Sequence, residues 1–460
     1  MNSLTDTSIA WPPTEQWLRV FTLADYNTRV VVLGTMLLGV AAGVIGSFML
    51  LRKRALMGDA LSHATLPGIG VAYLIMTAAG GTGRWLPGLL AGATASGLLG
   101  MGAVLVIRGQ SRLKEDAALG IVLSVFFGLG VAILGLIQQM TMGHAAGLES
   151  FIYGKTASML ARDAWLIGAA AAIVIVICAG LFKEFTLLCF DSEYASAGGW
   201  PVMLLDVIMM ALVVFVTVIG LQAVGLILMI ALLIIPPAAA RFWTHRFSRM
   251  VWLSALIGAT SGLVGAGISA LLPRLPAGAI IVVVAGSLFL VSMIFGTARG
   301  VLRRALAHWR LERLVERQHL LRALYEWHEA RGAADTAAAP ETTVPLSALR
   351  AARSWSSALL RRALARARHS GLVRVFPESG VVLSPVGWEA ARRVVRNHRL
   401  WETYLITHAD IAPFHVDRNA DAIEHVLEPA MIASLESLLA RSHPARLTPV
   451  PPNPHPMQAQ

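Results

Sequence analysis

Two ionisable side chains, Asp59 and His63, stand four residues apart inside an apolar stretch of the chain. On a helix this spacing places a carboxylate and an imidazole on one face. Ionisable groups in a membrane-spanning segment are costly and usually face one another or a polar path. Together they suit Mn²⁺, Fe²⁺ or Zn²⁺ better than Ca²⁺. The alternative is that Asp59 caps its helix and His63 only bonds to it, and the spacing alone leaves both interpretations open.

A second group of residues with metal-ligand side chains lies towards the C-terminus. His398 and Glu402 are four apart, and Asp421, Glu424 and His425 have i, i+3, i+4 spacing. Each set can converge on one ion if its segment is helical. Such sets on soluble helices more often form salt bridges than metal sites, and the presence of two sets in one short region shifts that balance towards a metal site.

The composition indicates which elements must position these residues. The chain of 460 residues is 56% hydrophobic and 14% charged, with a mean hydropathy of +0.65, which is typical of a membrane protein. The only two cysteines, Cys178 and Cys189, cannot form a disulfide framework or a four-thiolate metal site, so we expect oxygen and nitrogen to hold any metal. Runs long enough to cross a bilayer lie near 30–51, 58–77, 87–107, 117–138, 164–182, 201–220, 223–239, 251–272 and 277–297.

The basic residues predict the orientation of these nine spans. If the N-terminus is outside, the inner loops hold Arg52, Lys53, Arg54, Arg108, Arg112, Lys114, Lys183, Arg241, Arg246 and Arg249. The opposite loops hold only Arg84, Lys155, Arg162 and Arg274. This asymmetry is that of positive-inside proteins, and an odd number of spans places the C-terminal region in the cytoplasm. We read 148–162 as an external amphipathic segment and expect no cleaved signal peptide.

Glycine and proline mark special positions within the spans. Small residues such as Gly34, Gly39, Gly43 and Gly46 let helices approach closely. We expect helices broken at Pro67 with Gly68 and Gly70, and at Pro236 with Pro237, because such breaks usually line a cavity. We interpret five further polar residues as loop or helix-end groups: Gln138, His144, Glu149, Asp206 and Gln222.

The segment 51–70, LRKRALMGDALSHATLPGIG, closely resembles the signature of the ABC-type manganese/zinc/iron permeases (ABC-3 family). The resemblance extends over 29–298, through EDAALGIV at 115–122, FIYG at 151–154, FDSEYA at 190–195 and ALLIIPPAAAR at 231–241. It implies that Asp59 and His63 lie on a metal pathway. Pro237 stands where relatives often have alanine, which leaves the gate geometry open.

The same resemblance implies partners. The loop 191–199 would dock a separate ATPase, and four of its residues are candidates for that coupling: Asp191, Glu193, Ala195 and Gly198. No G-x-x-x-x-G-K-[ST] phosphate loop occurs in the chain, so ATP hydrolysis requires another subunit. An extracytoplasmic solute-binding protein and a second permease copy or paralogue are the other expected partners.

The C-terminal region has the pattern of a winged helix. Helices are predicted over 347–353 and 356–369, followed by two strands within 372–383. The second helix carries arginines that suit DNA phosphates or anionic lipid, namely Arg361, Arg362, Arg366 and Arg368. Membrane tethering limits access to the chromosome, so DNA is not the expected partner.

Residues from about 319 to 430 resemble the iron- and manganese-dependent (diphtheria-toxin-repressor-like) metalloregulators. This resemblance implies regulatory metal ligands at His398, Glu402, Asp421, Glu424 and His425, with His319 as a further ligand. His415 lies near, but not at, another ligand position. Arg322 stands where some manganese-type relatives have a carboxylate, which argues against a binuclear site.

The predicted fold is an all-α polytopic membrane protein of about nine transmembrane helices with a cytoplasmic winged-helix and helical metal-binding domain. Its predicted parts are an N-terminal segment (1–28), the permease domain (29–298), a connecting helix (299–330), the winged-helix-like domain (331–388), the metal-sensing or dimerisation-like domain (389–440) and a Pro-rich tail (441–460).

The predicted function is that of a non-enzymatic permease subunit in the bacterial plasma membrane. The cargo is a divalent metal ion, which also regulates the protein; manganese is favoured because Asp421 is an oxygen donor, with zinc and iron as alternatives. The alternative function is a membrane-anchored metal-dependent transcription regulator, for which nine spans with an intramembrane Asp and His exceed what anchoring needs.

Overall fold

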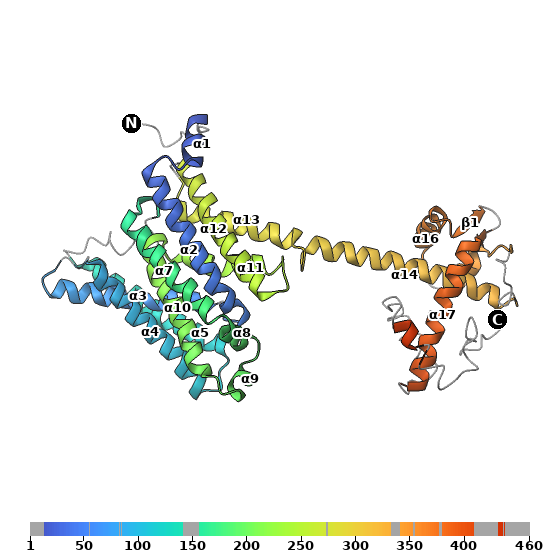
Figure 1. The fold of residues 1–460 in the computed structure, drawn as a ribbon, viewed down its shortest axis with the longest axis horizontal. Coiled ribbons are helices and arrows are strands. Elements are labelled where there is room, and N and C mark those ends of the chain that lie inside the picture. The colour runs from blue at the N-terminus through green and yellow to red at the C-terminus, as the bar shows by residue number, and fades with distance from the viewer. Residues whose placement is uncertain are drawn as a thin grey trace. The chain divides into compact units, whose positions relative to one another are not determined.

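In the computed structural model the chain forms two compact units, Met1–Arg304 and Ala305–Gln460. Figure 1 shows the elements of each. The structure describes residues 13–54, 56–81, 83, 85–140, 156–272, 275–332, 341–352, 355–376, 380–408, 431–435 and 437.

The described part of the first unit is helical. Eight helices are long and apolar enough to cross a membrane: α2 (Tyr26–Leu51), α3 (Met57–Ala78), α4 (Leu86–Gln110), α5 (Glu115–Gln139), α7 (Ala161–Gly180), α10 (Val202–Val224), α12 (Phe247–Leu271) and α13 (Ala277–Phe295). The remaining predicted span is α11 (Leu226–Ala240), whose 15 residues extend only about 22 Å. The shorter elements are α1 (Thr14–Phe21), η2 (Thr156–Ser158), α8 (Phe182–Phe190) and α9 (Ser192–Ala197).

Contacts between helix ends show that successive long helices run in alternating directions. At one end, Arg52 after α2 donates to the carbonyl of Leu188 in α8 at 2.7 Å, and the carbonyl of Phe242 after α11 accepts from the amide of Ala298 after α13. At the other end, Gln222 of α10 lies 3.3 Å from Asp163 of α7. The arginine-rich loops therefore gather at one end of the bundle, as their spacing predicted.

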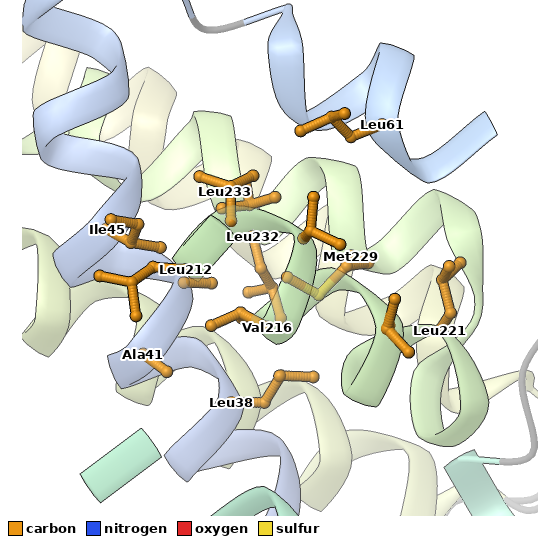
Figure 2. Close-up of a cluster of buried hydrophobic side chains, with 14 of the residues drawn as sticks. Leu38, Ala41, Ile45, Leu61, Leu212, Val216, Leu221, Met229, Leu232 and Leu233 are labelled. Atoms are coloured by element: carbon orange, nitrogen blue, oxygen red, sulfur yellow. The ribbon is translucent and has the colours of Figure 1, made fainter. Parts of the chain in front are cut away.

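A central core forms where α2, α3, α10 and α11 meet (Figure 2). The residues at its centre are almost fully buried: Leu38, Ala41, Ile45, Leu61, Leu212, Val216, Leu221, Met229, Leu232 and Leu233. Close backbone approach supports this packing, because a Cβ added to Gly39 would fall on the carbonyl of Gly258 in α12. Gly46 makes the same approach to the carbonyl of Leu233 in α11. The prediction of glycine-mediated helix packing is confirmed.

The contact between Gly39 and Gly258 gives a direct test of that packing. Gly258→Ala is expected to destabilise the protein by about 1–3 kcal/mol, because the added methyl group meets backbone that cannot rotate away. Gly286→Ala in α13 is the matched control, since a Cβ there meets nothing within 4 Å. Thermal unfolding in detergent should separate the two variants, and equal melting temperatures would contradict the close approach.

The predicted proline breaks are not present. Pro67 lies inside the continuous helix α3, and Pro236 and Pro237 lie inside α11. Glycines on neighbouring helices leave room for the rings, since a Cβ added to Gly130 would lie 3.4 Å from Pro67. The chain instead breaks between α10 and α11 at Gly225, whose φ of 82° favours glycine.

The second unit contains α14 (Val301–Glu329), α15 (Leu346–Ala352), α16 (Ser357–His369), the strands β1 (Val373–Phe376) and β2 (Gly380–Leu383), and α17 (Pro385–His408). The strands pair antiparallel, with Val373 opposite Leu383, and Val344 adds a bridge to Val381. The predicted sequence of two helices and a hairpin is therefore confirmed. The proposed loop at 331–340 is described only at its first two residues, and the tail at 441–460 lies outside the described residues.

A serine cap accounts for the start of α16, and side chains of α14 and α17 pack together in the core of this unit. The side chain of Ser356 accepts from the Leu359 amide and caps the helix. The second half of α14 contributes Tyr325, which packs against Trp388 of α17 with ring centroids 4.9 Å apart. His328 is buried beside Trp388, and burial, with a smaller contribution from the Arg331 charge, lowers its pKa. That imidazole is therefore neutral at neutral pH.

Candidate metal sites

Asp59 and His63 lie side by side on the first two turns of α3. Nε2 of His63 is 3.3 Å from Oδ1 of Asp59, and their side chains are 17% and 29% exposed respectively. The structure thus brings together the pair that the spacing predicted. His63 is about 9 Å along the helix axis from Met57, so the pair lies towards the arginine-rich end of the bundle.

The surroundings of His63 leave part of its ligand capacity open. Its ring packs edge-on against Phe127 of α5, with centroids 4.9 Å apart. Its Nδ1 atom is buried and has no hydrogen-bond partner among the described residues. Pro67 lacks the N–H that would bond to the His63 carbonyl, so the helix provides no i+4 donor for that oxygen. Imidazole, carboxylate and carbonyl groups are therefore close together on one segment.

The helix-capping interpretation of Asp59 is not supported by the geometry. Leu56 is the N-cap of α3 and makes no side-chain capping bond, while Asp59 is already the third helical residue. Within the described part of the chain, no three or more His, Cys, Asp or Glu side chains form a metal-binding group. A cation at Asp59 and His63 would need further ligands such as water. The donor types, oxygen and imidazole nitrogen, fit a transition metal.

Asp206 lies among three arginine side chains, a setting that its sequence context did not reveal. We expected it to be a helix-end group, but it is 2% exposed and forms an ion pair with the equally buried Arg54. Arg108 of α4 approaches it at 3.3 Å and Arg52 at 3.8 Å. One carboxylate therefore joins the loop before α3 to α4 and α10. The sequence signal that could have identified this role of Asp206 is the excess of basic residues in the loops at this end of the bundle.

The predicted coupling residues lie on or beside the short helix α9. Asp191 is its N-cap and accepts from the Tyr194 amide at 2.8 Å, while Ala195 is buried and Glu193 is exposed. Gly198 follows the helix as its C-cap. This segment presents large exposed aromatic side chains, namely Phe190, Tyr194 and Trp200. Just before it, burial raises the pKa of the Cys189 thiol to about 12.

In the second unit, His398 and Glu402 come together in the core. Nε2 of His398 is 3.1 Å from Oε1 of Glu402, and both side chains are almost fully buried. Nη1 of Arg322, on α14, lies 3.2 Å from the other ring nitrogen, Nδ1. The predicted ligand His319 is also on α14. The other candidate ligands lie outside the described residues: Asp421, Glu424, His425 and His415.

The four arginines of α16 differ in their surroundings. Arg361, Arg362 and Arg368 are exposed, as phosphate or lipid contacts would require. Arg366 is half-buried and forms an ion pair with Glu316 of α14. That residue therefore helps to hold α16 against α14.

The chain is similar to metal-transport proteins over most of its length. It is 37% identical over 404 residues to the manganese transport system membrane protein MntC of Bacillus subtilis, covering 88% of this chain and 89% of that one. It is 41% identical over 297 residues to the zinc transport system membrane protein TroC of Treponema pallidum, covering 65% of this chain and 96% of that one.

A solved structure and one family model agree with this likeness, and a second family model matches the C-terminal region. The structure of PsaBC from Streptococcus pneumoniae in complex with Fab matches with a TM-score of 0.55 and 28% identity, covering 64% of this chain and 100% of that chain. The model of the iron dependent repressor, metal binding and dimerisation domain, matches residues 384–446. The model of the ABC 3 transport family matches residues 24–296, more than half of the sequence. The chain belongs to the ABC 3 transport family.

Proposed function

We propose that this chain is the membrane-spanning permease subunit of an ATP-driven importer of a divalent transition metal. Manganese is the favoured cargo, with zinc and iron as the alternatives. The observation that carries the proposal is the pairing of Asp59 with His63 at 3.3 Å on an otherwise apolar helix. Placing a carboxylate and an imidazole in such a segment costs free energy, and a helix with a purely structural role would avoid that cost. We therefore assign the pair to the path of the cation.

The proposed mechanism is alternating access driven by a separate ATPase. The segment around α9 supports this proposal, because its exposed aromatic residues Tyr194 and Trp200 suit a protein interface. It lies at the arginine-rich end, which the positive-inside rule assigns to the cytoplasm. An extracytoplasmic binding protein would deliver the ion at the other end, and a second permease copy or paralogue would complete the pathway.

The second unit is proposed to be a cytoplasmic regulator that responds to imported metal. Its match to a metal-binding repressor domain supports this role, as does the buried pair of His398 and Glu402. The residues predicted to complete the site are Asp421, Glu424, His425 and His319. Metal bound there would inhibit transport only if the ion binds two arrangements of the protein unequally.

The cargo can be tested by metal accumulation. Cells that lack their own manganese and zinc importers would receive this chain with its ATPase and binding protein, and ⁵⁴Mn, ⁶⁵Zn and ⁵⁵Fe uptake would be measured separately. The expected result is ATPase-dependent uptake of manganese at a higher rate than that of zinc or iron. Uptake of none of the three ions above that of cells with an ATPase-inactive partner would overturn the proposal.

A further inference from the structure

A guanidinium group already occupies one side of the proposed regulatory site. Nη1 of Arg322 lies 3.2 Å from Nδ1 of His398, on the side of the ring away from Glu402. Arg322 is 8% exposed and His398 is 1% exposed. The arginine comes from α14 and the histidine from α17, so the contact joins two elements that are 76 residues apart in sequence.

The chemistry of arginine determines which atoms of His398 are available. A guanidinium has only donors, so Nδ1 must direct its lone pair at Arg322. The single hydrogen of the neutral ring then lies on Nε2, which faces the carboxylate of Glu402 at 3.1 Å. A metal ion needs a ring nitrogen with a free lone pair. In this arrangement neither nitrogen of His398 can ligate a metal.

We infer that Arg322 is a resident cation that competes with metal for the buried pair of His398 and Glu402, so that metal binding must expel Arg322 from its contact with the histidine. This inference rests on the proposed regulatory role of the second unit. The arginine positive charge and a divalent ion cannot share this small buried space without strong repulsion. Occupancy by one therefore excludes the other.

The structure also provides a place for the displaced arginine. Nε of Arg322 bonds to Oε1 of Glu326 at 2.7 Å on the same helix, and Glu326 is 30% exposed. Arg322 can thus leave His398 and keep a carboxylate partner nearer to solvent. When Arg322 leaves His398, the contact between α14 and α17 changes. The chain enters the second unit from the first through α14. Metal occupancy would then act on the helix that leads to the membrane domain.

The exchange can be measured by Mn²⁺ binding to the purified full chain in detergent. All variants would carry Asp59→Ala and His63→Ala to remove the proposed transport site, and free Mn²⁺ would be followed by electron paramagnetic resonance. Arg322→Met removes the charge but retains much of the volume, and it is expected to tighten Mn²⁺ binding by about 10- to 100-fold, the range seen when groups beside metal ligands are changed. Arg322→Lys keeps a cation and should bind as weakly as the parent.

Two controls distinguish competition from general loosening of the site. Arg399→Met breaks another ion pair between α17 and α14, to Glu329 at 2.8 Å, without touching the His398 ring, and should leave affinity unchanged. Adding His398→Ala to Arg322→Met should abolish the gain. Equal affinity in the parent and Arg322→Met, or an equal gain in Arg399→Met, would overturn the inference alone. Absence of Mn²⁺ binding in every variant would overturn both the inference and the regulatory site.

Discussion

Asp59→Ala is expected to reduce metal uptake to the background of cells without the permease. The variant removes the only carboxylate within contact distance of His63 among the described residues, and with it the negative charge that offsets a desolvated divalent ion. His63→Ala removes the nitrogen ligand and is expected to lower the apparent affinity by at least about 10- to 100-fold. Initial rates of ⁵⁴Mn uptake over a range of concentrations would measure both effects.

The control for these variants lies between them on the same helix. The hydroxyl of Ser62 bonds to the carbonyl of Gly58, within its own turn, so Ser62→Ala should leave uptake close to that of the wild type. Membrane levels of all three proteins must be compared by immunoblotting. Wild-type uptake by both Asp59→Ala and His63→Ala would remove the basis of the proposed transport pathway.

Features that depend on neighbours in sequence could be predicted. The lengths of the apolar runs and the glycine spacing along α2 predicted the helices and their close packing. The i, i+4 spacing predicted the contacts of Asp59 with His63 and of His398 with Glu402. In each case one helix holds both partners, so local geometry is sufficient.

Features that depend on distant parts of the chain could not be predicted. Asp206 meets Arg54 across 152 residues, and nothing in the sequence around Asp206 indicates which loop returns to it. The expectation of broken helices was wrong, since α3 continues through Pro67 and α11 through Pro236 and Pro237. Next to Pro67 the neighbouring helix has Gly130, which has no side chain to meet the ring. Arg322 could be suspected as a replacement for a carboxylate, but its contact with Nδ1 of His398 depends on how α14 and α17 pack.

Asp206→Ala is expected to destabilise the first unit more than Asp59→Ala or Asp163→Asn does. It would leave Arg54, which is 2% exposed, buried without its ionic partner and would weaken the attachment of Arg108 and Arg52. Breaking a buried ion pair from one side costs about 3–5 kcal/mol. We therefore expect a much lower melting temperature and reduced membrane levels of the variant, measured by detergent-based thermal unfolding and immunoblotting.

A double variant separates the ionic effect from simple loss of packing. Asp206→Leu with Arg54→Met replaces the pair by apolar side chains of similar size, and such exchanges are often neutral or stabilising. The double variant should therefore be more stable than Asp206→Ala. Asp163→Asn provides a second control, because that carboxylate contacts Gln222 at the opposite end of the bundle. If Asp206→Ala were as stable as Asp163→Asn, the charge cluster would not hold α10 to the loop before α3. The stability of the arginine-rich end would then have to come from apolar packing alone, such as the contact of Phe48 with Phe247 at 5.0 Å.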